Sequence, residues 1–201
     1  AVQEVLNRSL SELLKEDIHT IGASRTDAGV HARGNVAVFD TESRMAGEKI
    51  AFAVNTYLPE DIRAQGSREV SAEFHPRFTS TVKTYEYKIL NRRFADPTRR
   101  LDSMFWYGRL DVEAMKEAAA HLAGTHDFRS FAASHGAAEN TVRNIYDIRL
   151  WKEEDMIHLR ITGNGFLYNM VRIIAGTLLE VGKGSIHPEQ IPRILEAKDR
   201  S

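Results

Sequence analysis

The feature that most constrains the fold of this chain is a predicted strand pair followed by a long apolar segment. Residues 144–151 and 156–162 predict two strands, and in the second one Ile157, Leu159 and Ile161 alternate with polar side chains. The four charged residues that separate the strands predict a hairpin. The apolar residues 166–181 then predict a helix that ends at Gly182. Together these elements require an architecture that mixes helices with a sheet.

The remaining segments fit the same fold class. Apolar spacing or a helix-capping signal predicts further helices over residues 2–14, 49–58 and 112–122, and a short one after Pro188. Strands are predicted over 34–40 and 81–90. The sequence therefore predicts an α+β fold of two similar α/β halves. Because the segment around Asp96-Pro97 is typical of a connection, we expect the halves to be residues 1–92 and 93–201.

The balance of charge conceals a local excess of positive charge. The 201 residues carry 27 Lys and Arg against 28 Asp and Glu, a formal net charge of −1. Residues 77–109 hold eight of the bases and only three acids, so this stretch is +5 and the remainder is −6. Aromatic residues are interleaved with these bases, a combination that suits phosphates and unstacked nucleobases. The alternative is a pair of strands with basic solvent faces and buried rings.

Cysteine and long apolar runs are both missing from the sequence. A chain without cysteine forms no disulfide and no thiolate metal site, which fits a reducing compartment, and we expect a cytoplasmic protein. No apolar run approaches the roughly 20 residues of a membrane-spanning helix, and because no basic segment followed by an apolar one stands at the start of this sequence, we expect no secretory signal. The eight histidines form no recognised metal-binding pattern.

The segment 24–32, Ser-Arg-Thr-Asp-Ala-Gly-Val-His-Ala, combines reactive side chains with small residues just before a predicted strand. Gly29 permits unusual backbone angles, and Ala28 allows close approach of other groups. A carboxylate placed like that of Asp27 can serve as nucleophile, general base or metal ligand. The alternative is an Asx-type turn in which Arg25 and Asp27 form a local ion pair.

Residues 25–32 resemble the signature loop of the TruA family of tRNA pseudouridine synthases. Other blocks recur in the order that this family has, and they run through most of the chain. These blocks are residues 58–62, 74–78, 83–89, 126–131 and 165–176.

The resemblance implies a fold, a reaction and a set of site residues. The fold would be the pseudouridine synthase fold, with mainly antiparallel sheets and a central cleft that holds the site. The reaction would be the conversion of uridine to pseudouridine at positions 38, 39 and 40 of the tRNA anticodon arm, without a metal or organic cofactor, by a homodimer. Asp27 would be the nucleophile, Tyr85 would stack on the everted uracil, and Arg172 would pair with Asp27. Arg25 would help to hold the flipped-out nucleotide or the strand that it left, and we expect Arg77 and Lys83 to bind substrate as well.

The chemistry of the reaction favours these residue types. A uridine inside a stem must leave the stack before its glycosidic bond is accessible, and an aromatic ring such as that of Tyr85 offsets part of the few kcal/mol that this costs. An aspartate in a partly desolvated pocket stays ionised more readily beside an arginine. Arg172 is the candidate because it lies in an apolar helix, where an uncompensated guanidinium would be costly. The alternative is an arginine that extends from the helix face to solvent.

The sequence differs from the family pattern in two ways, and two other functions remain possible. Ser24 stands where the family commonly has Gly, and we expect one strand to be missing at each end of the chain. A tRNA-binding or RNA-folding module without activity could use the same basic surface. A nucleoside N-glycosylase could use the same carboxylate and flipped base, but it would release the base to water.

Overall fold

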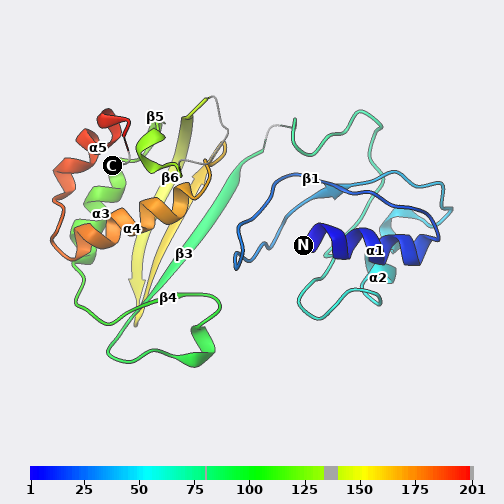
Figure 1. The fold of residues 1–201 in the computed structure, drawn as a ribbon, viewed down its shortest axis with the longest axis horizontal. Helices are drawn as coiled ribbons and strands as arrows, with labels where there is room; N and C mark the ends of the chain where they lie inside the picture. The colour runs from blue at the N-terminus through cyan, green and yellow to red at the C-terminus, as the bar shows by residue number, and fades with distance from the viewer. Residues whose placement is uncertain (80, 134–139, 200–201) are drawn as a thin grey trace. The chain divides into compact units, whose positions relative to one another are not determined.

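The computed structural model describes residues 1–79, 81–133 and 140–199 and divides into two compact units. The first unit comprises residues 1–79 and the second comprises residues 80–201 (Figure 1). Each unit has its own hydrophobic core, and each is described separately below. Within the described ranges, no helix combines the length and the apolar content that a bilayer crossing requires.

The first unit contains two helices and a short antiparallel strand pair. Helix α1 (Val2–Leu14) matches its prediction, and α2 (Gly47–Val54) lies within contact distance of it. Helix α2 ends four residues before the predicted end at Leu58, and the chain leaves it through tighter turns in which the N–H groups of Thr56 and Tyr57 donate three residues back, to the carbonyls of Ala53 and Val54. The buried side chains of this unit's core are Leu10, Leu14, Ile18, Ile50, Val54 and Leu58.

The strand predicted over residues 34–40 is much shorter in the structure. Only Ala37–Val38 (β2) pairs, with Ile21–Gly22 (β1), in an antiparallel register that places Ile21 opposite Val38. One further backbone bond, from Ala23 N–H to the Val36 carbonyl at 2.8 Å, extends the pairing toward the loop. The prediction of a seven-residue strand was therefore wrong, because the segment has a partner over only a few residues.

The second unit is built on a five-stranded sheet in the order β4-β3-β7-β6-β5 (Figure 1). Strands β6 (Val142–Glu153) and β7 (Met156–Gly163) form the predicted hairpin, and β3 (Lys83–Asn91) pairs antiparallel with β7. The two edge strands, β4 (Met104–Trp106) and β5 (Gly124–Asp127), were not predicted. Strand β4 runs parallel to β3, so the sheet is mixed, and the predicted α+β class is confirmed.

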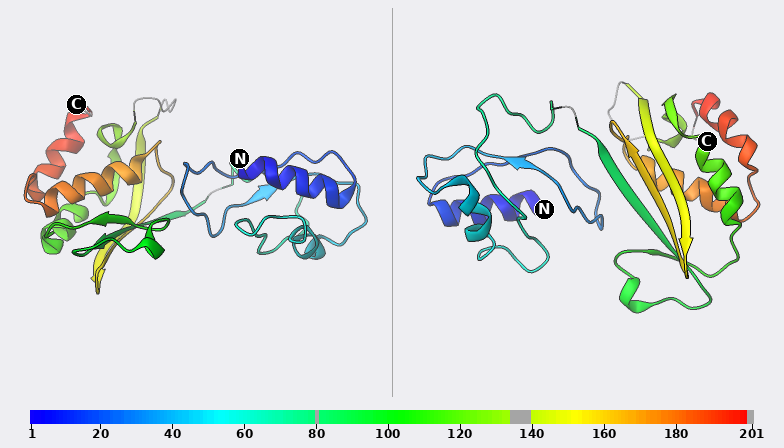
Figure 2. Two further views of the ribbon diagram at one scale, coloured as in Figure 1. Left: turned by 60° about the horizontal axis from the view of Figure 1, so that its bottom comes forward. Right: turned by 180° about the vertical axis from the view of Figure 1, so that it is seen from behind.

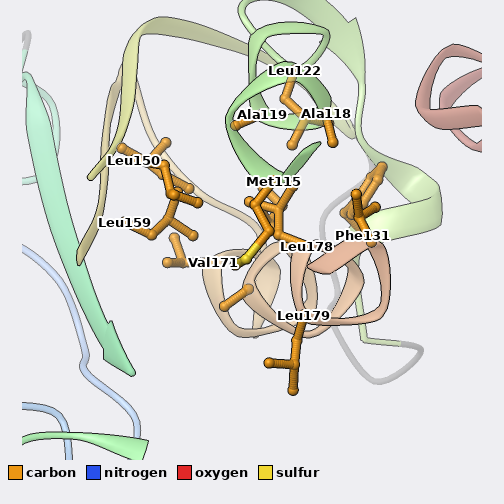
Figure 3. Close-up of a cluster of buried hydrophobic side chains, with 14 of the residues drawn as sticks. Met115, Ala118, Ala119, Leu122, Phe131, Leu150, Leu159, Val171, Leu178 and Leu179 are labelled. Atoms are coloured by element: carbon orange, nitrogen blue, oxygen red, sulfur yellow. The ribbon is translucent and has the colours of Figure 1, made fainter. Parts of the chain in front are cut away.

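Three helices cover one face of this sheet (Figures 1 and 2). They are α3 (Val112–Ala120), α4 (Met170–Gly182) and α5 (Ile191–Ala197), and short 3-10 turns occupy Pro97–Arg99, Arg129–Phe131 and Pro188–Gln190. Figure 3 shows how the helices and the sheet share one core, in which Met115 of α3 lies beside Leu178 of α4. Asp111 caps α3 as predicted, since its Oδ1 accepts from the N–H groups of Glu113 and Ala114.

Helix α4 starts later than its sequence pattern predicts. The apolar pattern begins at Phe166, but the helix begins at Met170. Asn169 has a φ of 58°, a left-handed conformation that Asn tolerates better than most residues and that breaks the helical path. The four residues before Met170 therefore form a turn that packs on the core through Leu167.

Strand β3 belongs to the sheet of the second unit. It pairs with β7 from Lys83 to Leu90, so the compact unit begins before this strand, at residue 80. The predicted functional halves, residues 1–92 and 93–201, stay a prediction.

Candidate active site

Asp27 lies in a tight turn within the loop that joins β1 to β2. The N–H of Val30 donates to the carbonyl of Asp27 at 3.1 Å, which closes a four-residue turn. Gly29, the third residue of that turn, has a φ of 78°, and an added Cβ would meet nothing within 4 Å. The glycine is therefore required for its backbone conformation rather than for space. This turn leaves the Asp27 side chain half-buried and Arg25 exposed.

Arg77 lies at the base of the same loop. Its Nε donates to the carbonyl of Gly22, the last residue of β1, at 3.0 Å. On the other side of the loop, the Asn35 amide donates to the Ser24 carbonyl at 3.2 Å. Two side-chain bonds thus hold the ends of the loop that carries Asp27. Arg77, predicted to bind substrate, thus contacts Gly22, which precedes Asp27 by five residues.

Lys83 and Tyr85 project from the same face of β3. Lys83 lies opposite Gly163, and Tyr85 lies opposite Ile161 of β7. Since strand residues two apart share a face, both side chains are on the helix-covered side of the sheet, together with Tyr87 and Ile89. Tyr87 packs against the core, and the Tyr85 ring is half-buried.

The ring of Phe166 packs edge-on against Tyr85. The ring centroids are 5.1 Å apart and the planes are inclined by 75°. Phe166 belongs to the connection between β7 and α4, and it packs against the core. Phe166, which lies four residues before the start of α4, therefore positions the Tyr85 ring.

Arg172 is the third residue of α4, and its side chain is exposed. The helix buries Met170, Val171 and Ile174, and Arg172 lies outside this buried set. The ion pair between Arg172 and Asp27 stays a prediction.

Arg143 is a basic residue near this region that the sequence reasoning missed. Its Nη1 donates to the carbonyls of Asn140 at 2.9 Å and Val142 at 2.7 Å, and a Cβ added at Gly165 would lie 3.8 Å from its Nε. Burial lowers the pKa of this arginine from its ordinary value. The sequence spacing could have placed Arg143 on the inner face of β6, because this arginine precedes the buried Ile145 by two residues and strand residues two apart share a face.

The predicted site residues thus fall into two groups. Arg25, Asp27 and Arg77 belong to the loop region of the first unit, and Lys83, Tyr85 and Arg172 belong to the second unit, around the connection from β7 to α4. Among the residues that the structure describes, no three His, Asp or Glu side chains are grouped so as to hold a metal ion. His135, one of the eight histidines, lies outside the described residues.

Comparison with known proteins identifies the family. A family model described as tRNA pseudouridine synthase matches residues 1–79 and 118–201, which include Asp27 and Arg172 but not Lys83 or Tyr85. A protein of Ruminiclostridium cellulolyticum named tRNA pseudouridine synthase A is 47% identical over 201 residues, which is 100% of this chain and 82% of that protein.

Other relatives extend over the same span. A protein of the same name from a Thermoanaerobacter species is 46% identical over 200 residues, covering 100% of this chain and 82% of the relative. A protein of Clostridium tetani named tRNA pseudouridine synthase A 2 is 47% identical over 199 residues, covering 99% of this chain and 80% of the relative. The family model and the full-length similarity agree, and the chain belongs to the tRNA pseudouridine synthase family.

Proposed function

We propose that this protein isomerises uridine to pseudouridine at positions 38, 39 and 40 of the tRNA anticodon stem-loop, with Asp27 as the nucleophile. The isomerase activity on tRNA uridine is supported by membership of the tRNA pseudouridine synthase family. The anticodon positions rest on the resemblance of residues 25–32 and of the blocks that follow. The observation that supports Asp27 is its place in a turn whose conformation depends on Gly29.

The reaction exchanges one bond to the ribose for another. The bond between uracil N1 and ribose C1′ breaks, the uracil turns, and C5 bonds to C1′. The proton that C5 carried leaves, and N1 takes up a proton, so the product is an isomer of the substrate. The Asp27 carboxylate can attack C1′, add to the uracil ring, or act as a base that leads to a glycal.

The other predicted residues bind different parts of the substrate. Tyr85 stacks on the everted uracil, because an aromatic ring can replace the neighbours that the base loses when it leaves the stem. Phe166 supports this role by fixing one side of the Tyr85 ring. Arg25, Arg77 and Lys83 contact the RNA backbone, for which guanidinium and ammonium groups supply charge-assisted hydrogen bonds.

Arg172 acts on the carboxylate rather than on the RNA backbone. A guanidinium within a few Å of an aspartate favours the ionised form, which is the form that a nucleophile or base needs. The exposed position of Arg172 in the first turn of α4 leaves its side chain able to reach a charged partner.

The test is tritium release from transcribed tRNA that carries 5-tritiated uridine. We expect the wild-type protein to release tritium and Asp27→Asn to release none while it still binds the tRNA. Asp40→Asn is the matched control, because Asp40 is an exposed carboxylate of the same unit outside the Asp27 turn. Tritium release by Asp27→Asn at the wild-type rate would overturn the assignment of the nucleophile.

Two other functions give different outcomes in the same assay. A binding or folding module would bind tRNA and release no tritium from any form of the protein. A nucleoside N-glycosylase would release free uracil, which chromatography of the supernatant detects. Mapping of the modified nucleotides by reverse-transcription stops after carbodiimide treatment tests positions 38, 39 and 40.

The proposal also includes a homodimeric state and a cytoplasmic location. The resemblance supports a homodimer that holds tRNA across both subunits, and light scattering on the purified protein measures its mass. A tRNA substrate supports a cytoplasmic location, which fractionation of cells tests.

A further inference from the structure

Two large rings are exposed at one end of the sheet of the second unit, at the opposite end of β3 from Lys83 and Tyr85. Phe94, just after β3, is 65% exposed, and Tyr107, just after β4, is 76% exposed. Phe94 and Tyr107, with the residues beside them at 92–94 and 107–109, are called the corner surface below. Within β3 the rings of Tyr85 and Tyr87 pack against the core instead.

The side chain of Asn91 brings the two parts of the corner surface together. Its amide donates to the carbonyls of Trp106 at 3.1 Å and Gly108 at 2.7 Å, one on each side of Tyr107. Arg92, Arg93 and Phe94 follow Asn91 directly in the chain. The two exposed rings therefore belong to segments that the Asn91 side chain holds together at the ends of β3 and β4.

Close packing holds the second part in place. A Cβ added at Gly108 would lie 2.8 Å from the Trp106 indole nitrogen, so the chain turns closely around this ring. The ring of Trp106 stacks on Tyr107, with centroids 6.0 Å apart and planes inclined by 24°. Lys183, at the end of α4, places its Nζ 5.5 Å from the Trp106 ring centre. Tyr107 is thus exposed to solvent but supported from behind.

The charge of this surface is positive and incompletely neutralised. Residues 92–109 contain five arginines and two aspartates. Arg92 has Asp155 at 3.8 Å, and Arg99 has Asp102 at 3.7 Å. Arg93 lies over the Phe94 ring at 5.1 Å, and neither Arg93 nor Arg109 has a carboxylate within ion-pair distance in the part of the chain that the structure describes.

We propose that the corner surface is a second tRNA-contacting surface, which binds the substrate outside the isomerised nucleotide. Arg93 and Arg109 contact phosphates, and Tyr107 and Phe94 stack on an unpaired base. This inference rests on the proposed function only in taking tRNA as the substrate, and it uses none of the predicted catalytic residues.

RNA fits this surface better than a protein partner does. An exposed ring beside unpaired arginines offers both the stacking platform and the phosphate contacts that single-stranded or looped RNA needs. Protein–protein interfaces are also enriched in aromatic residues and arginine. What favours RNA is the local excess of positive charge, five arginines against two aspartates in residues 92–109. The surface also belongs to a chain whose family acts on tRNA, a polyanion.

The test measures binding of an unmodified tRNA transcript to the full protein at several salt concentrations. We expect Arg93→Gln and Arg109→Gln each to reduce the slope of log K against log salt by about 0.7 to 0.9, the value for one lost phosphate contact. Tyr107→Leu should weaken binding by about tenfold, as expected for the loss of one stacked base. For all three variants KM should rise while kcat stays at the wild-type value.

Matched controls come from exposed residues elsewhere in the same unit. Arg193 is an exposed arginine of α5, a helix that packs near the opposite sheet edge β5. Tyr146 of β6 is 53% exposed. We expect Arg193→Gln and Tyr146→Leu to leave both the affinity and the salt slope unchanged.

Two results would overturn the inference. One is an affinity and slope for Arg93→Gln, Arg109→Gln and Tyr107→Leu equal to those of the wild type. The other is a loss of dimer mass in these variants that accounts for the whole loss of affinity, which would make the surface a protein interface. A wild-type protein that forms no pseudouridine but loses tRNA affinity through these variants would reject the proposed function and support the corner surface.

Discussion

The Phe166 ring meets the Tyr85 ring edge-on, with 5.1 Å between centroids, and this contact links the turn before α4 to the middle of β3. Edge-to-face pairs contribute about 0.5–1.5 kcal/mol beyond their buried area, so each ring restrains the other. Because Tyr85 is proposed to stack on the uracil, the orientation of its ring should depend on Phe166.

We expect Phe166→Leu to lower kcat by about tenfold with less than a twofold change in tRNA affinity, because a small displacement of a positioning group slows the reaction more than it weakens binding. Single-turnover rates and filter binding measure the two effects. Tyr85→Leu should lower kcat further. A weaker affinity for Phe166→Leu at an unchanged kcat would contradict the proposed role of this contact.

Arg172→Ala should lower turnover far more than it lowers tRNA affinity, because the proposed partner of Arg172 is a carboxylate and not a phosphate. Arg193→Ala, on the exposed side of α5, is the control for removal of a helix-surface arginine. Steady-state kinetics with tRNA transcripts provide both constants. If only affinity falls in Arg172→Ala, the residue belongs with the phosphate contacts.

Gly29→Ala should destabilise the Asp27 turn, because its φ of 78° is strained for any residue with a Cβ, at a cost of about 1–2 kcal/mol. No clash adds to this cost, since nothing lies within 4 Å of the added Cβ. The control is Gly34→Ala, in the same loop, where the added Cβ also meets nothing within 4 Å and φ is not positive. We expect lower activity for Gly29→Ala and wild-type activity for Gly34→Ala.

Asp127 should make the second unit sensitive to acid. The hydrogen bond from the Thr141 hydroxyl at 2.6 Å, helped by the Arg129 N–H and by the charges of Arg129 and Lys198, lowers the pKa of this carboxyl. A carboxyl whose pKa is lowered on folding stabilises the protein above its ordinary pKa, and this stabilisation is lost as the pH falls through the lowered value.

Asp127→Asn should therefore be less stable than the wild type near neutral pH, with a difference that shrinks as the medium becomes acidic. Urea unfolding at several pH values measures the free energy of unfolding for both proteins. Asp147→Asn is the control, because Asp147 forms only a partly exposed ion pair with Arg149. A difference that is constant with pH would exclude the charge of Asp127 as its cause.

The parts of the fold that follow from local rules were predictable. Helix α1 follows from apolar spacing, and the start of α3 follows from Asp111, whose carboxylate caps two N–H groups. The β6–β7 hairpin follows from alternation and a charged turn. In each case the signal lies in the residues of the element itself or directly beside it.

The parts that depend on distant partners were not predictable. Strand β4 forms because Met104 to Trp106 can pair parallel to the end of β3, a contact that its own three residues do not signal. Helix α4 starts at Met170 rather than Phe166 because the preceding turn is held by a bond from Ala133 N–H to the Tyr168 carbonyl. The predicted strand over 34–40 shrank to Ala37–Val38 for lack of a longer partner.

The same division applies to the candidate site. The motif around Asp27 was recognisable because its residues are consecutive, and Gly29 fulfils the conformational role assigned to it. The support of Tyr85 by Phe166 and the place of Arg143 beside Gly165 depend on the sheet and its connection to α4. These contacts join residues that are more than twenty positions apart, where spacing carries no signal.

The long register between β3 and β7 has a consequence for how this chain can change in evolution. Eight consecutive positions of β3, from Lys83 to Leu90, are matched to β7, and a slip by one residue would move Tyr85 to the opposite face. An insertion or deletion in the segment just before Lys83 would therefore leave Tyr85 on the same side of the sheet, because the side is set by the pairing of β3 with β7 and not by the length of the chain before it.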